Sequence, residues 1–255
     1  MGPVPSLLED MTWPEVKAHA DAGTPVVLPA GSTEQHGPHL PLSTDSVIAQ
    51  EIALEAARAI DLVVAPPVRY GAMSRPLIGG GERFPGTVSL RANTLITTMK
   101  EILLGLAKGG FRNLCLFNWH YENAAYLWEA ADLAVAQRPD VRVLVIESPM
   151  PEFSEQELSE LFPSGFTGWD TEHASHLETS LMYVLRPDLV RVDKIADDRA
   201  RRHPTWDVVP APDDFIPASG VLMKPSEFQE AAGKRFLQAA AGRLVEAITT
   251  EFGRG

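Results

Sequence analysis

The chain has 255 residues, of which 45% are hydrophobic, and we expect residues 1–255 to form one domain with a full core. Its net charge of −12 argues against nucleic acid or an anionic membrane as partner, because both attract clustered Lys and Arg. The sequence shows no apolar run long enough to span a bilayer and no secretion signal, and its single cysteine, Cys115, cannot form an internal disulfide. These features predict a cytoplasmic protein that binds a small molecule.

Predicted strands and helices alternate along the chain. Thr12 and Glu15 form a capping-box pattern at the start of a helix that we expect to end near Ala22. Short apolar runs predict buried strands at 25–28, 62–65, 113–117 and 141–146. Apolar residues spaced three and four apart, among helix formers, predict helices at 45–60, 93–108, 121–137, 154–161, 172–185 and 226–252. This alternation predicts an α/β fold with a largely parallel sheet and helices on both faces.

Two long segments between these elements are predicted to be loops. Residues 66–86 are rich in Gly and Pro, and a loop of that length inside a compact domain is usually functional or mobile. Residues 186–224 contain many prolines, glycines and charges without a clear period. We expect this second loop to pack on the surface or on a neighbouring subunit.

Two pairs of potential metal ligands follow two of the predicted strands. Glu34 and His36 come after strand 25–28, and His120 and Glu122 come after strand 113–117. Because residues two apart in an extended chain point to the same side, each pair can close on one ion. Asp45 adds a carboxylate, although an Asp at a helix start is more often a cap. Mixed imidazole and carboxylate ligands suit Zn or Mn. We predict Glu34 and His120 on one ion, His36 and Glu122 on the other, and Asp45 as the bridge.

Several ordered motifs carry these residues: Ser-Thr-Glu-Gln-His-Gly-Pro-His-Leu-Pro from Ser32, Asn-Trp-His-Tyr-Glu-Asn from Asn118, and Gly-Trp-Asp-Thr-Glu-His from Gly168. From about residue 12 to residue 189 the chain resembles the creatininase family. The resemblance implies a three-layer α/β/α fold, a binuclear Zn or Mn centre and a homo-oligomer similar to the family's hexamers. It also implies a metal-dependent amidohydrolase that acts on a small cyclic amide, as in the interconversion of creatinine and creatine.

The resemblance also implies roles for residues outside the metal ligands. His173 matches the family's catalytic histidine, which is expected to shuttle a proton, and Glu122 is expected to act in catalysis as well as in metal binding. The residues expected to meet the substrate are Glu172, Trp169, Tyr121, Gly79, Gly80 and Gly81. Two plainer interpretations are that Trp169 is a core aromatic and that His173 caps a helix or lies on the surface.

The chain departs from the creatinine hydrolase of the family near the expected substrate site. That enzyme has a lid tryptophan where this chain reads 147–153 without one, and a glycine where this chain has Trp119. We hypothesise that Trp119 or Phe153 fills the space of the lid; alternatively, Trp119 faces a subunit contact.

The substrate therefore stays open between three classes. The family also contains enzymes that hydrolyse a formamide of a pyrimidine precursor and enzymes that cleave a short peptide during redox-cofactor maturation. A phosphorylated precursor would need a basic pocket, and the only arginine cluster, Arg199–Arg202, lies in the irregular segment. A non-catalytic metal-binding scaffold is the alternative from another functional class; it would need neither His173 nor Glu172.

Overall fold

A five-stranded sheet forms the centre of the protein, in a computed structural model that describes residues 5–75, 81–147, 150, 153–166, 168–169, 172–198, 208–209 and 216–253. The strands lie in the order β1-β3-β2-β4-β5, and each adjacent pair is parallel. They are β1 (Ser6–Leu7), β2 (Val26–Ala30), β3 (Val63–Val64), β4 (Asn113–Asn118) and β5 (Arg142–Ile146). The predicted parallel sheet is confirmed. The sequence did not predict β1, because Ser6–Leu7 does not lie within a clear apolar run, whereas the equally short β3 lies in Leu62-Val-Val-Ala.

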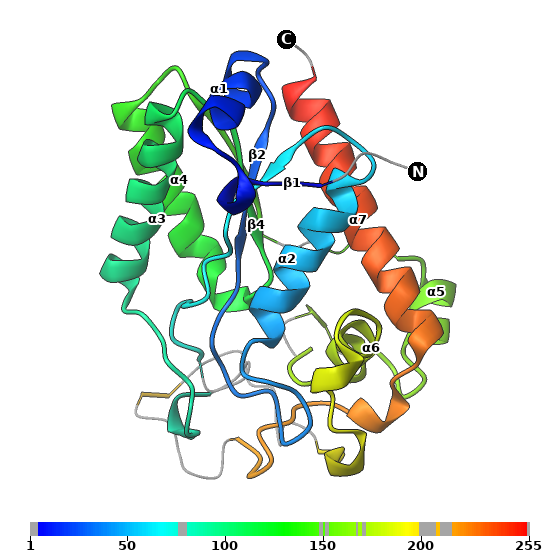
Figure 1. The fold of residues 1–255 in the computed structure, drawn as a ribbon. Helices are drawn as coiled ribbons and strands as arrows, with labels where there is room; N and C mark the ends of the chain where they lie inside the picture. Colours follow the sequence, from blue (N-terminus) through cyan, green and yellow to red (C-terminus); the bar gives the residue numbers. More distant parts are fainter. Residues whose placement is uncertain are drawn as a thin grey trace.

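Helices cover both faces of this sheet (Figure 1). The α-helices of the described part are α1 (Trp13–Asp21), α2 (Thr44–Ala57), α3 (Ala92–Lys108), α4 (Ala124–Gln137), α5 (Glu155–Leu161), α6 (His176–Leu185) and α7 (Glu230–Phe252). Six short 3-10 helices complete them: Leu8–Asp10, Gly81–Arg83, Tyr121–Asn123, Pro187–Leu189, Val192–Lys194 and Pro225–Glu227. Among the described residues, no helix is both long enough and apolar enough to cross a membrane.

Alternate residues of the central strands point into two separate hydrophobic clusters. Val26 of β2 and Leu114 of β4 pack with α3 and α4, whereas Val27 and Cys115, the next residue in each strand, pack with α2, α6 and α7. Successive side chains of a strand point to opposite faces, so the fully buried strands build two cores. The three-layer α/β/α prediction is therefore confirmed. Cys115 is fully buried, and burial raises the pKa of its thiol.

Three predicted α-helices begin later than expected; the one predicted over 121–137 opens with the 3-10 helix Tyr121–Asn123 before α4. We predicted a helix from residue 172, but α6 starts at His176, because the Ser175 hydroxyl accepts from the Glu178 backbone N–H as an N-cap and Ala174 has a positive φ of 50°. Residues 172 and 173 therefore precede the helix. We predicted the last helix from residue 226; instead Pro225–Glu227 forms a 3-10 turn and α7 begins at Glu230.

The expectation that residues 186–224 form a loop on the surface or on a neighbouring subunit is wrong for part of the segment. Ile216, Val221 and Leu222 are buried inside the protein, and the Leu222 backbone N–H donates to the carbonyl of His173 at 3.3 Å. A run of two or three apolar residues between prolines and glycines shows no period, so the sequence did not reveal this packing. The arginine cluster at 199–202 lies outside the described residues.

Candidate metal centre

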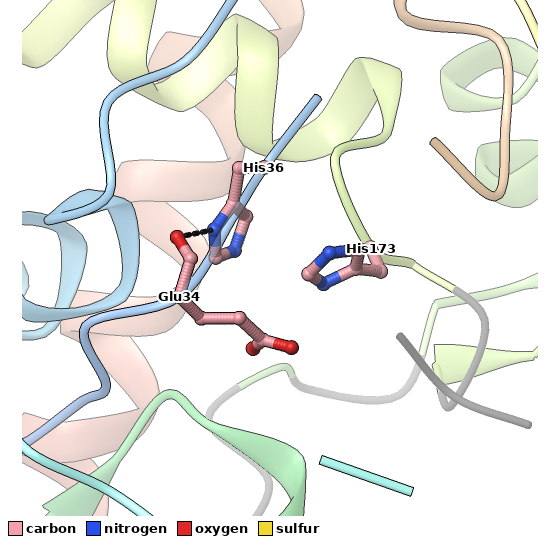
Figure 2. A group of neighbouring side chains, drawn as sticks. All are labelled: Glu34, His36 and His173. Atoms are coloured by element: carbon pink, nitrogen blue, oxygen red, sulfur yellow. Dashed lines mark hydrogen bonds between the residues drawn. The ribbon is translucent and has the colours of Figure 1, made fainter. Parts of the chain in front are cut away.

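The loop after β2 and the first turn of α2 carry three of the predicted ligands into the interior, Glu34 and His36 in the loop and Asp45 in the helix. Glu34, His36 and Asp45 are each at most 2% exposed. Gly31 lets this loop lie against the start of α2, because a Cβ at that position would stand 2.5 Å from the Ser46 backbone nitrogen. The His36 Nδ1–H donates to the carbonyl of Glu34 at 3.0 Å (Figure 2). Its Nε2 is thereby turned towards Asp45, whose Oδ1 is 3.1 Å away.

The loop after β4 brings the second pair beside the first. β2 and β4 are neighbours, with Ala30 opposite Asn118, so the residues that follow them meet at the same sheet edge. The Asn118 side chain accepts from the His120 N–H at 3.1 Å and donates to the His120 carbonyl at 2.7 Å. His120 Nε2 donates to the carbonyl of Ala72 at 3.0 Å. Its Nδ1 lies 3.4 Å from Glu34 Oε2 and 3.2 Å from Asp45 Oδ2.

The described part of the chain contains three groups of potential metal ligands. Within each group the ligand atoms lie within 4.8 Å of one another. The groups are Glu34 with Asp45 and His120, His36 with Asp45 and Glu178, and Glu34 with His36 and His173 (the last drawn in Figure 2). Glu34, His36 and Asp45 each belong to two of the groups, and Asp45 is the one that both histidines contact, through Oδ1 and Oδ2. Its Oδ2 is buried without a hydrogen-bond partner, which a positive ion would satisfy. These nitrogen and carboxylate donors fit Zn or Mn.

Glu122, predicted to share an ion with His36, contacts His120 in the structure, and its role as a ligand stays a prediction. It lies on the other side of the His120 ring, with Oε2 3.6 Å from Nε2, and its Oε1 accepts from the Arg75 backbone N–H at 3.0 Å. The three groups in the described residues do not include Glu122. Glu178 lies beside His36, in the place that we predicted for Glu122. Its Oε2 is 3.6 Å from His36 Nε2.

Glu178 falls in the helix predicted over residues 172–185 and was not selected as a ligand from the sequence. The first turn of α6 directs its side chain, and two hydrogen bonds hold it there: the Ala174 N–H donates to Oε2 at 2.8 Å, and the Trp119 indole N–H donates to Oε1 at 3.3 Å. No acid–histidine pair two residues apart marks this carboxylate. The only signal in the sequence was the Glu-Thr-Ser-Leu run that begins at Glu178.

The buried acids and histidines shift one another's protonation. Burial raises the pKa of Glu34 to about 7. Burial alone would lower the pKa of His120, but Glu122, Asp45 and Glu34 outweigh it and raise that pKa to about 10. Likewise, Asp45 and Glu178 hold the pKa of His36 well above its usual value in spite of burial. Without ions, these rings carry protons, which metal binding would have to release.

Five of the eight predicted catalytic and substrate residues, His173, Glu122, Tyr121, Trp169 and Glu172, line one cavity of about 100 Å³. Its lining residues are Glu34, Asp45, Asn118, Trp119, His120, Tyr121, Glu122, Glu147, Met150, Trp169, Glu172, His173, Leu177 and Glu178. Trp169 and Tyr121 are therefore brought to the site. Gly81 is buried against Glu34, with 2.6 Å between its ideal Cβ position and Glu34 Oε1, whereas Gly79 and Gly80 lie outside the described residues.

His173 and Glu172 have opposite protonation tendencies. His173 is buried with its ring centroid 4.4 Å from that of His36, and burial together with the charge of His36 lowers its pKa well below the usual value. Burial raises the pKa of Glu172 to about 8, and both of its carboxylate oxygens are buried without a hydrogen-bond partner in the described structure. In the absence of ions and near pH 7, His173 is therefore a neutral imidazole, and the preceding residue, Glu172, is a neutral carboxylic acid.

The two residues proposed to occupy the lid space differ in position. Trp119 lines the cavity, whereas Phe153 belongs to an aromatic cluster, with ring centroids 6.1 Å from Trp169 and 6.3 Å from Phe236. Phe162 packs in the same cluster. Of the two residues, Trp119 is therefore the one that shapes the cavity.

Comparisons with known proteins agree with this geometry. The family model described as creatinine amidohydrolase matches residues 9–248. Creatinine amidohydrolase of Pseudomonas putida is 36% identical over 249 residues, which is 95% of this chain and 96% of that protein. The mycofactocin precursor peptide peptidase of Mycolicibacterium smegmatis is 34% identical over 176 residues, which is 67% of this chain and 61% of that protein.

Solved structures of creatininase also superpose closely. A manganese creatininase has a TM-score of 0.92 and 34% identity, covering 97% of this chain and 99% of that one. A Zn–Zn form of a creatininase variant has the same score and identity, covering 97% of this chain and 98% of that one.

Proposed function

The chain belongs to the creatininase family and is a metal-dependent amidohydrolase, and we propose that it interconverts creatinine and creatine by hydrolysing a C–N bond of a small cyclic amide. The observation that carries this proposal is the buried set of ligands around Asp45, at the floor of a cavity with aromatic walls. The name of the Pseudomonas putida relative supports the choice of creatinine.

We propose two divalent ions per chain, Zn or Mn. Glu34, Asp45 and His120 would hold one ion, and His36, Asp45 and Glu178 would hold the other. When bound, such ions supply Lewis-acid charge that polarises a carbonyl group and lowers the pKa of water. The Zn and Mn forms of the related creatininase structures support this choice of metals.

Other residues of the cavity would bind the substrate and handle its protons. We propose that the rings of Trp169 and Tyr121 contact the flat face of the substrate, as aromatic walls do in small-molecule sites. Glu172, whose pKa is raised to about 8 by burial, would donate an O–H hydrogen bond near neutral pH. His173 would contact the reacting amide. Glu122, whose pKa is raised by burial, would hold a proton on the Nε2 side of His120.

A short peptide is the second candidate substrate, because a relative named as a peptide peptidase aligns over two thirds of this chain. The formamide of a phosphorylated pyrimidine precursor is less compatible with the cavity, since no Lys or Arg is among the residues that line it in the described structure. The single domain over residues 1–255, the hexamer-like oligomer and the cytoplasmic location stay predictions.

One experiment tests the function. The protein is stripped with a chelator, reloaded with Zn or Mn, analysed for metal per chain, and assayed against creatinine, other cyclic amides, formamides and a short peptide. We expect two ions and creatinine turnover, both lost in Asp45→Asn and retained in the matched surface variant Asp132→Asn, whose carboxylate is exposed on α4. Two ions with turnover of a peptide or a formamide alone would replace creatinine as the substrate. Two ions without any turnover would favour the metal-binding scaffold.

A further inference from the structure

Backbone groups from two distant segments hold the side-chain amide of Gln35 in one orientation. The Gly37 N–H donates to Gln35 Oε1 at 2.9 Å, and Gln35 Nε2 donates to the carbonyl of Gly220 at 2.9 Å. A backbone N–H can only donate and a carbonyl can only accept. The oxygen and nitrogen of this buried amide therefore cannot be exchanged.

The same amide nitrogen lies 2.8 Å from Nε2 of His173. Because the amide nitrogen is a donor only, His173 Nε2 must be the acceptor. A neutral imidazole that accepts at one nitrogen carries its proton on the other, so the proton of His173 is on Nδ1.

Gly220 makes this arrangement possible. It has a positive φ of 73°, and a Cβ at this position would overlap the Gln35 Oε1 atom. The adjacent Val221 and Leu222 are buried, and Leu222 is hydrogen-bonded to the His173 carbonyl. The segment around Gly220 thus holds both the amide and the backbone of His173.

We infer that Gln35 is a positioning residue that keeps the proton of His173 on Nδ1, so that Nδ1 is the nitrogen from which His173 can donate. A proton on Nε2 would place one N–H against another at 2.8 Å. The part played by His173 in the reaction rests on the proposed function, but the position of its proton does not.

Long-range ¹H–¹⁵N correlation spectra of the ¹⁵N-labelled, Zn-loaded full chain test this inference, because they distinguish the two neutral forms of each imidazole. The His173 signals are assigned by their loss in His173→Gln. We expect a protonated Nδ1 and an unprotonated Nε2 in the wild type. Gln35→Glu places an acceptor at the same point, so the proton should move to Nε2. Gln35→Met is similar in length but offers no donor, so both forms should be populated.

Activity and a remote variant complete the test. With the wrong tautomer, kcat of Gln35→Glu should fall by about 10²–10⁴-fold with a smaller change in KM, and Gln35→Met should lose less. Gly220→Ala lies outside the segment of metal ligands; it should displace the Gln35 amide and so release Nε2. Metal content and thermal unfolding of each variant verify the fold. A wild-type His173 protonated on Nε2, or an unchanged tautomer in Gln35→Glu, would overturn the inference whether or not creatinine is the substrate.

Discussion

Replacing Glu178 by Gln should remove one of the two proposed ions. The Glu178 carboxylate is buried and lies 3.6 Å from His36 Nε2. Gln keeps the shape of the side chain but loses the charge. Removing a residue that only orients a metal ligand costs about 10–100-fold in affinity. Loss of a ligand should therefore weaken the second ion by at least about 100-fold, or roughly 2.7 kcal/mol.

Glu122→Gln is the matched control, since it makes the same chemical change on the far side of His120. Both ions should stay bound, and the affinity for Zn should fall by less than about 100-fold. The reason is that Glu122 contacts the ring of the proposed metal ligand His120 and belongs to none of the ligand groups in the described residues. Each variant is stripped with a chelator and titrated with Zn against a competing indicator, and metal per chain is measured by elemental analysis.

The opposite result would refute this geometry. If Glu122→Gln retained one ion and Glu178→Gln retained two, the pairing of His36 with Glu122 expected from the sequence would be restored. The position of Glu178 would then be a feature of the ion-free arrangement alone.

Three further predictions address the cavity, the pH dependence and the packing of the helices. Trp119→Gly should increase turnover of a creatinine-sized substrate, because the indole occupies the cavity wall; steady-state kinetics identical to wild type would contradict this role. In the folded protein Glu172 keeps its proton up to about pH 8, whereas an ordinary Glu loses it near pH 4.5. The contribution of Glu172 to the free energy of unfolding therefore falls as the pH rises from 4.5 to 8. Glu172→Gln should thus stabilise the chelated protein at pH 8 by up to about 4 kcal/mol and have little effect at pH 4.5, as measured by urea unfolding; equal effects at the two pH values would argue against a neutral acid. Gly233→Ala should cost about 2–4 kcal/mol in the same assay, because its Cβ would overlap the Ser180 carbonyl where α7 crosses α6, whereas the exposed Gly242→Ala should not destabilise the protein.

The sequence by itself determined the layers of the fold and selected the residues of the first candidate ligand group, Glu34, Asp45 and His120. Buried parallel strands appear as short apolar runs whatever the rest of the chain does, and ligands two residues apart after such strands meet at one sheet edge. Glu34, His36 and His120 could therefore be selected from local pattern alone. Asp45 was ambiguous as a helix cap until the structure placed its carboxylate between both histidines.

Only the tertiary structure showed which carboxylate lies beside His36 and what holds His173. Glu178 reaches His36 because α6 starts at its Ser175 cap and aims its first turn at the loop after β2. Gln35 and Gly220 meet across 185 residues of chain. Contacts of this kind depend on how helices and loops pack in three dimensions, and packing leaves no periodic signal in the sequence.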